Sequence, residues 1–317
     1  SGHSDCVQVL IDAKTSVDVK DTDSYTPLHH AASNDQIGVV QVLIDAKACL
    51  DIRDYLGKTP MHRAAIHDYA DIVRMLVDAK AGLDIQDKNG ETPLHYAASY
   101  HYSGIAQVLV NAKASVDVRN NNGATPLRIA VSKGHSGLGQ LLVAAKANVD
   151  VPDEDGYAPI HAAAQIEHTD CLRMLINAKA RVGVRDSRGY TPLHYAAMRV
   201  NSGAVQVLVA SGASITARAV YDRFDSNTKT PLQFAEKSGY PDTANVLRAA
   251  EMVRTFDVAR DGTRDNVQQM LSWKGSLEWK TAAGRTLLME AVLADNADVV
   301  KVLIEAKASV TTEHENG

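Results

Sequence analysis

A short motif returns along the chain at a fixed interval and limits the folds it can adopt. Thr-Pro-Leu-His at residues 26–29 recurs with small changes at 59–62, 92–95, 125–128, 158–161 and 191–194, so successive copies start 33 residues apart. A seventh copy, at 230–233, follows after 39 residues, and a degenerate eighth lies at 286–289. Such a period is typical of a repeat protein, in which each unit packs only on its neighbours.

Each unit has the pattern of a turn followed by two short helices. In the first complete copy, Thr26 is a suitable N-cap, and Pro27 suits the first helical position, where it loses no hydrogen bond. A second helix is predicted over 39–44, because Val40, Leu43 and Ile44 share one apolar face. One such unit cannot bury its apolar faces alone, so stacking is obligatory.

With these motifs the chain resembles the ankyrin repeat family over nearly its whole length. The resemblance implies an all-α ankyrin repeat solenoid of about nine stacked helix-turn-helix units with β-hairpin turns. It also implies that partners bind on a concave face made by the hairpin tips and the first helices. Finally, it implies that each periodic histidine bonds the backbone of the neighbouring turn; these are His29, His62, His95, His161 and His194.

Two departures concern positions where the family commonly has glycine. After the second helix only Gly212 keeps the usual residue, and the other copies have Lys14, Lys47, Lys80, Lys113, Lys146, Lys179 and Lys307. A left-handed non-glycine residue costs about 1–2 kcal/mol, whereas a cation at a helix C-terminus returns about 0.3–1 kcal/mol. We therefore expect some strain there. We also expect small distortions between the two helices at Asp35, Asp68, His101, Glu167 and Val200.

The spacing of the motifs suggests the domain organisation. Residues 1–250 are predicted to form one array: a partial first repeat, six 33-residue repeats, and a seventh after a charged loop at 218–229. Residues 251–317 are predicted to be a degenerate repeat that either starts a second stack or continues the first. The chain opens in the middle of a repeat, so we expect it to be a piece of a longer protein.

Composition narrows the function classes. The formal net charge of −5 argues against a general nucleic-acid binder, which usually carries a basic surface. The three cysteines form no CxxC pair, which favours a reducing, intracellular and cytoplasmic setting over a disulfide framework or zinc site. No apolar run is long enough to span a bilayer, and no signal peptide is recognisable.

The periodic polar residues do not suggest catalysis. Histidines about one repeat apart lie too far from each other to share a metal ion. The recurring Asp18, Asp51, Asp84, Asp117 and Asp150 are expected to bond the backbone of their own hairpins. No GxSxG, phosphate-binding loop or HExxH motif is present. We therefore expect neither enzymatic activity nor a cofactor.

The expected binding residues are the tyrosines and charged residues around each motif. One cluster near the start comprises Tyr25, His30, Tyr55 and Arg63, and another comprises Tyr157, Arg188, Tyr190 and Tyr195, with Tyr96 and Tyr100 between them. Tyrosine and arginine are enriched in interface hot spots. The sequence therefore favours a scaffold or adaptor that binds a protein partner in the concave groove.

Two alternatives stay open. The array could be the regulatory or targeting region of a larger enzyme or channel that lies outside this stretch. It could also bind a polyanion along an edge formed by Lys47, Lys80, Lys113, Lys146 and Lys179. The acidic residues four positions further on offset that edge, and screening of exposed charges weakens its field, so we favour solvated helix-end cations there.

Overall fold

The computed structural model describes residues 2–13, 15–166, 169–222, 225–263, 267, 279–281 and 283–306. The chain divides into two compact units, Ser1–Ser187 (unit 1) and Arg188–Gly317 (unit 2). The described secondary structure is almost entirely helical, which confirms the predicted all-α solenoid of stacked helix pairs.

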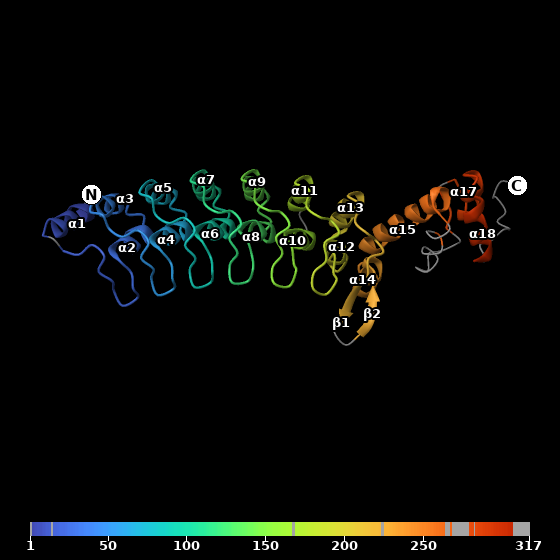
Figure 1. Ribbon diagram of the computed structural model, residues 1–317, viewed down its shortest axis with the longest axis horizontal. Coiled ribbons are helices and arrows are strands. Elements are labelled where there is room, and N and C mark those ends of the chain that lie inside the picture. Colours follow the sequence, from blue (N-terminus) through green and yellow to red (C-terminus); the bar gives the residue numbers. More distant parts are fainter. Residues whose placement is uncertain are drawn as a thin grey trace. The chain divides into compact units, whose positions relative to one another are not determined.

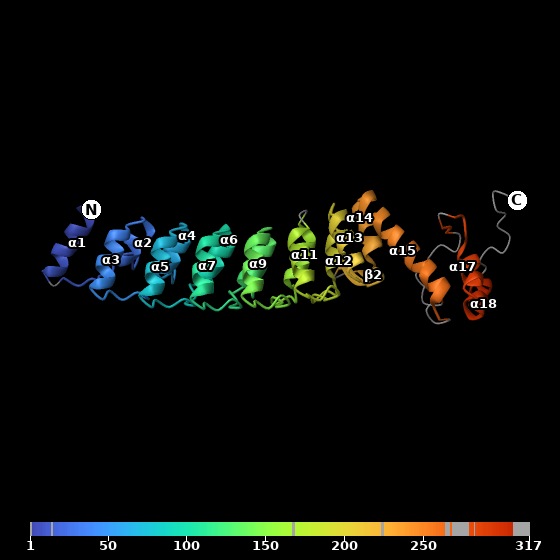
Figure 2. The same ribbon diagram turned by 90° about the horizontal axis from the view of Figure 1, so that it is seen from above.

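Unit 1 consists of two rows of short helices (Figures 1 and 2). The inner row, which begins at the Thr-Pro motifs, contains α2 (Pro27–Ser33), α4 (Pro60–Ile66), α6 (Pro93–Tyr100), α8 (Pro126–Ser132) and α10 (Pro159–Gln165). The outer row contains α1 (Gly2–Asp12), α3 (Ile37–Asp45), α5 (Ala70–Asp78), α7 (Ser103–Asn111), α9 (Ser136–Ala144) and α11 (Asp170–Asn177). Each helix packs on the next one of its own row.

The core of unit 1 lies between the two rows. Each repeat contributes one large residue from its inner helix and one from its outer helix, and both are fully buried: Leu28 and Leu43, Met61 and Leu76, Leu94 and Leu109, Leu127 and Leu142. Alanine pairs such as Ala31 and Ala32 are also fully buried. Small side chains there let consecutive inner helices approach closely.

Unit 2 contains α12 (Pro192–Ala197), α13 (Ser202–Ala210), β1 (Ala219–Asp222), β2 (Asp225–Lys229), α14 (Pro231–Ser238), α15 (Pro241–Asp261), α17 (Leu287–Leu293) and α18 (Ala297–Glu305). Val267, Leu287, Val299 and Leu303 form a buried cluster with Ala259 of α15. The long helix α15 also packs on α13 and α14. Helix α15 therefore continues past residue 250 and ends at Asp261, while the predicted domain boundary at residue 250 stays a prediction.

The insertion at 218–229 is a β-hairpin rather than the expected loop. Strands β1 and β2 pair antiparallel, with Ala219 opposite Lys229 and Val220 opposite Thr228. The tip, residues 223 and 224, lies outside the described residues. Within the described residues the structure contains no strands besides β1 and β2. The hairpins predicted for the other repeats are therefore turns without paired strands.

Left-handed backbone conformations occur at most of the positions where the sequence predicts strain. Lys47, Lys80, Lys113, Lys146 and Lys179 all have left-handed backbones, with φ between 61° and 70°. Asp35, Asp68 and His101 are also left-handed. Val200 is not, because a β-branched residue tolerates that conformation poorly, and α12 before it is only 6 residues long. Glu167 lies outside the described residues, as do Lys14 and Lys307.

Candidate functional site

The turns that precede the inner helices of unit 1, here called fingers 1 to 5, are residues 21–25, 54–58, 87–91, 120–124 and 153–157. Each begins with an aspartate or asparagine whose Oδ1 accepts two backbone N–H bonds within the finger, such as Asp54 from Leu56 and Lys58 at 2.8 and 2.9 Å. Backbone bonds also join neighbouring fingers, for example from Lys88 N to Leu56 O at 2.9 Å. The fingers therefore form a fixed row beside the inner helices (Figure 1).

The other oxygen of these aspartates holds side chains on the surface between the fingers and the inner helices, here called the finger surface. Asp54 pairs with Arg63 of α4, whose Nε lies 2.9 Å from Oδ2. The guanidinium of Arg63 lies over the ring of Tyr25 from finger 1, 4.6 Å from its centroid. Aromatic, carboxylate and cation thus form a triad that joins two repeats.

The next repeat contains the same kind of triad with two members exchanged. Asp87 accepts bonds from Lys58 Nζ of finger 2 and from the hydroxyl of Tyr96 on α6, the latter at 2.7 Å. The carboxylate of Asp87 is fully buried, and Lys58 is nearly so. Burial raises the pKa of Asp87, but the bonds from Lys58 and Tyr96 outweigh it and hold that pKa below its ordinary value. Burial and the bond to Asp87 raise the pKa of Tyr96.

The pattern ends at finger 4, where the three corresponding positions carry Glu91, Asn120 and Ile129. Ile129 has no group to donate, and the neutral Asn120 needs no cation. For Asp153 of finger 5, the position that corresponds to Arg63 and Tyr96 carries Ala162, which has no group to donate. The Oδ2 of Asp153 lies 3.8 Å from Nη2 of Arg128 in the preceding repeat. Built triads are therefore confined, within unit 1, to the first three fingers.

The periodic histidines are structural, as the sequence indicates. In His62, Nδ1 accepts the Thr59 N–H at 3.1 Å, so Nε2 carries the proton and donates to Glu91 O at 3.0 Å. Equivalent bonds extend from His29 to Lys58 O, from His95 to Ala124 O and from His194 to Lys229 O. His161 instead bonds Val184 O, six residues earlier in the next repeat. Desolvation by burial lowers the pKa of His62 and of His95 to about 4, so both are neutral near pH 7.

Comparison with known proteins establishes the family. A family model described as ankyrin repeats in three copies matches residues 1–87, 79–153 and 137–219, and a model of one ankyrin repeat matches 283–314. This chain belongs to the ankyrin repeat family. Its fold is similar to the crystal structure of the ankyrin repeat domain of Bcl-3, described as a unique member of the IkappaB protein family. The two are 28% identical with a TM-score of 0.63, over 71% of this chain and 99% of that one. No curated protein matches this chain significantly.

The ankyrin array gathers most of the first predicted cluster on the finger surface. Tyr25, His30 and Arg63 lie together, with the rings of Tyr25 and His30 5.1 Å apart and His30 Nε2 2.8 Å from Asp21 Oδ2. Tyr55 lies at the tip of finger 2 and is 48% exposed. Tyr100, at the end of α6, is 51% exposed and stacks near Tyr96 and Tyr102.

The second predicted cluster has members in both units, and two of its tyrosines are buried. Arg188 donates to the hydroxyl of Tyr195 at 3.1 Å and lies over the ring of Tyr190, both in unit 2. Tyr157 belongs to unit 1, where its hydroxyl accepts a bond from Gln165. Tyr96, Tyr190 and Tyr195 are buried, at 7%, 4% and 8% exposure, because each packs against neighbouring rings. Their burial leaves little of each ring for a partner to contact, and the expectation that they bind one on the concave face stays a prediction.

The acidic ladder serves the stack in a way the sequence analysis missed. Asp51 Oδ1 accepts the N–H of Gly82 at 2.8 Å, and Asp84 accepts that of Ser115 at 2.9 Å. Each aspartate thus bonds the next repeat rather than its own hairpin. The five lysines of the predicted edge are exposed, and no ion pair is recorded for them within the described ranges.

Sequence reasoning also missed the aspartates that build the triads. Their signal was visible, since an aspartate lies five residues before five of the six regularly spaced motifs, at Asp21, Asp54, Asp87, Asp153 and Asp186, and Asn120 takes that place before the fourth. Over the described ranges no group of three or more His, Cys, Asp or Glu could hold a metal ion. No described helix is both long enough and apolar enough to cross a bilayer.

Proposed function

We propose that this ankyrin array binds a protein partner on the finger surface of its first three repeats. The observation that carries the proposal is that Tyr55 and Tyr100 stand about half exposed beside two triads that are rigidly bonded. An exposed tyrosine loses little side-chain entropy on binding and offers both an apolar ring and a hydroxyl.

The triads support this proposal because they hold their surroundings in place before a partner arrives. Arg63 is fixed by Asp54 and by the Tyr25 ring, and Tyr96 is fixed by Asp87 and Lys58. The side chains of Arg63 and Tyr96 lose their conformational entropy when the protein folds. Less free energy is therefore lost when a partner binds. Binding then depends on the exposed Tyr55, Tyr100 and His30, while the triads supply the platform.

We also infer that the described region acts by binding rather than catalysis. Its buried histidines are engaged in capping and inter-repeat bonds, which leaves no free base beside a nucleophile at those positions. The free thiols of Cys6, Cys49 and Cys171 support a reducing, cytoplasmic location.

Site-specific photo-crosslinking tests the proposed surface. A benzophenone amino acid replaces Tyr55 or Tyr100 in turn, and it replaces Gln41 on the outer helix α3 as the control. The proteins are irradiated in an extract of the cells that make the protein, and the adducts are identified by mass spectrometry. We expect one partner to crosslink from positions 55 and 100 and not from 41.

Variants taken from the chain's own repeats provide the matched test. Tyr55→Ser introduces the residue that Ser187 provides at the same finger position, and Tyr100→Asn introduces the equivalent of Asn34. Both substitutions leave the triads intact, so the fold should be kept and the adduct at the other position should weaken at least fivefold. Equal crosslinking from position 41, or adducts unaffected by both substitutions, would contradict the proposal.

A further inference from the structure

Two imidazole rings meet where the repeat of α6 and α7 borders the repeat of α8 and α9. His101 lies between α6 and α7, and His135 directly precedes α9. Their ring centroids are 4.5 Å apart and their planes differ by 10°, so the rings stack face to face. We call this pair the imidazole joint, because it connects two consecutive repeats.

The two rings of the imidazole joint are held differently. Nδ1 of His135 lies 3.0 Å from the carbonyl oxygen of Ala98 on α6. A carbonyl oxygen only accepts, so this nitrogen carries a proton and donates it whether the ring is neutral or charged. The ring of His101 is exposed and makes no side-chain hydrogen bond to the described residues, so stacking on His135 positions it.

The backbone at His101 is strained. Its φ of 63° is left-handed, and the residue at the same place one repeat later is Gly134, which adopts that conformation without steric cost. The turn is closed by a bond from Tyr102 N to Ala97 O at 2.9 Å. His101 is thus kept in an unfavourable conformation, with the stacked ring of His135 as its compensating contact.

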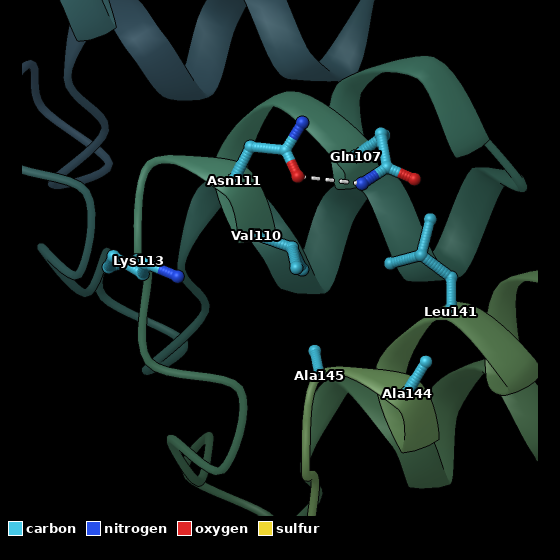
Figure 3. Close-up of a pocket in the computed structure, with 7 residues that line it drawn as sticks. All are labelled: Gln107, Val110, Asn111, Lys113, Leu141, Ala144 and Ala145. Atoms are coloured by element: carbon cyan, nitrogen blue, oxygen red, sulfur yellow. Dashed lines mark hydrogen bonds between the residues drawn. The ribbon is translucent and has the colours of Figure 1, made fainter.

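The side chains around the imidazole joint offer it no opposite charge. Neither α7 nor α9 contains an ionisable residue, and the hollow of about 520 Å³ between them (Figure 3) has Lys113, beyond the far end of α7, as its one charged lining residue. Lys133, two residues before His135, is a further cation. Among the described residues, neither ring forms an ion pair with a carboxylate within 4.0 Å.

Other titratable groups lie on the elements around the joint. They are Tyr100 and Tyr102 beside His101, His95 and Tyr96 on α6, Arg128 on α8, and His67, Asp68 and Tyr69 on the turn before α5. His95 and Tyr96 are buried, and Arg128 pairs with Asp153. Glu167 and His168, at the corresponding place after α10, lie outside the described residues.

Histidine is the side chain whose charge ordinarily changes between about pH 5 and 8. Two imidazolium rings 4.5 Å apart lie within a Debye length of each other, so salt screens their repulsion only in part. We propose that the imidazole joint is an acid-sensitive connection between the two repeats. When both rings are protonated, His135 keeps its bond to Ala98, the ring of His101 leaves the stack and the left-handed turn loosens. The joint is therefore closed above the titration of the pair and opens as the pH falls through it.

Opening the joint would affect the finger surface through Tyr100, which directly precedes His101 and stacks near Tyr96 and Tyr102. A looser turn changes the surroundings of Tyr100, so acid would weaken the binding of a partner there. This consequence rests on the proposed function, whereas the opening of the joint does not.

Amide hydrogen exchange of the full chain at about pH 7.5 and about pH 5.5 tests the joint, within the range where histidine titrates. Exchange is expressed as protection relative to an unstructured peptide, which removes the intrinsic effect of pH. We expect the protection of the Tyr102 amide to fall at least about fivefold at the lower pH, because opening the joint exposes it. The Tyr69 amide is the internal control, since its bond to Ala64 O at 3.0 Å is the equivalent bond one repeat earlier. Its protection should change less than about twofold.

Two variants use residues that the chain already has at equivalent positions. His101→Gly introduces the residue of Gly134, and His135→Tyr introduces that of Tyr69 and Tyr102. Each removes one titrating ring, so the protection of the Tyr102 amide should no longer depend on pH. The controls His67→Asn, which introduces the residue of Asn34, and Glu167→Gln remove titrating groups of the neighbouring turns and should leave the effect unchanged. Circular dichroism verifies that every variant is folded.

The imidazole Cε1–H resonances report when each ring is protonated. Unchanged Tyr102 protection with both rings protonated would show that the stack does not hold the turn, and rings that stay neutral at the lower pH would equally overturn the proposal. An equal fall at Tyr69 assigns the effect to acid in general, and a fall that persists in His101→Gly assigns it to another group. If the joint opens while the crosslink from position 100 is unchanged, only the link to the finger surface is contradicted.

Discussion

Arg128 Nη2 lies 3.8 Å from Asp153 Oδ2, and this contact replaces a hydrogen bond that the neighbouring repeats make with histidine. Arg128 stands at the fourth position of its motif, where His95 and His161 donate to the next repeat. Its Nε is buried and has no hydrogen-bond partner. One repeat interface thus carries a long ion pair and an unsatisfied donor instead of a neutral, fully bonded imidazole.

Substitution of Arg128 by histidine should stabilise the array. The change removes an unsatisfied buried donor, worth about 1–3 kcal/mol, and restores a bond of about 0.5–1.5 kcal/mol. The lost ion pair is partly exposed and long, so it contributes less than about 1 kcal/mol. We expect a net gain of about 1–2 kcal/mol in urea unfolding. A loss of stability would show that the ion pair with Asp153 contributes more than its geometry indicates.

The repeats could be located from sequence because one residue pattern recurs with little change. Period, caps and apolar faces all agree, as at Thr59, His62 and Leu76, and the structure has a helix pair at each copy. The structure differs from the sequence-based prediction where the repeat pattern is interrupted. The β1–β2 hairpin and the 21-residue helix α15 have no counterpart in the regular repeats, so the repeat pattern could not predict them.

The site was predicted less completely for a physical reason. The identity of a residue gives its chemistry, but its exposure depends on what the next repeat places against it. Tyr55 and Tyr96 have the same side chain, yet one is 48% exposed and the other 7%. Tyr96 is buried because its hydroxyl bonds Lys58 and Asp87. These partners lie 38 and 9 positions before Tyr96 in the sequence, so the sequence alone does not show that they meet.

The two triads should be interchangeable. Tyr25, Asp54 and Arg63 occupy the positions that Lys58, Asp87 and Tyr96 occupy one repeat later, with aromatic and cation exchanged. Tyr96→Arg alone places two cations around one buried carboxylate and should cost about 2–4 kcal/mol. The double variant, Lys58→Tyr with Tyr96→Arg, recreates the first triad and should recover most of that loss.

A double-mutant cycle from chemical denaturation gives the coupling energy of that exchange. We expect at least about 1.5 kcal/mol between the two positions, because they share one carboxylate. The cycle of Gln41→Tyr with Tyr96→Arg is the control, since Gln41 lies on the outer helix α3, where its amide donates to Asp45 at 2.9 Å. Additive effects in the triad cycle would mean that the Asp87 carboxylate does not couple the two positions.

Acid should destabilise unit 1 through its buried histidines. The pKa of His62 and of His95 falls from 6.5 to about 4 on folding, so the unfolded state binds protons first as the pH drops. The stability that the two neutral histidines contribute is therefore fully present above about pH 6.5 and is lost as the pH falls from 6.5 to 4. From pH 7 to pH 5 each histidine should cost about 2 kcal/mol.

The control for this pH dependence comes from the seventh repeat. Gln233 takes the histidine position there, and its Oε1 accepts the Thr230 N–H at 3.0 Å. Glutamine thus keeps the cap and does not titrate. The double variant His62→Gln, His95→Gln should lose about 4 kcal/mol less than the wild type between pH 7 and pH 5. Parallel losses in both proteins would assign acid sensitivity to other groups.

The acidic ladder should stabilise the interfaces between repeats through its oxygen rather than its charge. Asp51 Oδ1 accepts the Gly82 N–H at 2.8 Å, a bond that spans two repeats and that asparagine could also accept. Asp51→Asn should therefore change stability by less than about 0.5 kcal/mol, whereas Asp51→Ala should lose about 1 kcal/mol. Hydrogen exchange of the Gly82 amide provides a local measurement, with several-fold faster exchange expected in Asp51→Ala alone. If exchange accelerates equally in both variants, the carboxylate charge matters more than the hydrogen bond. The ladder would then stabilise the array by attracting the neighbouring lysines rather than by bonding consecutive repeats.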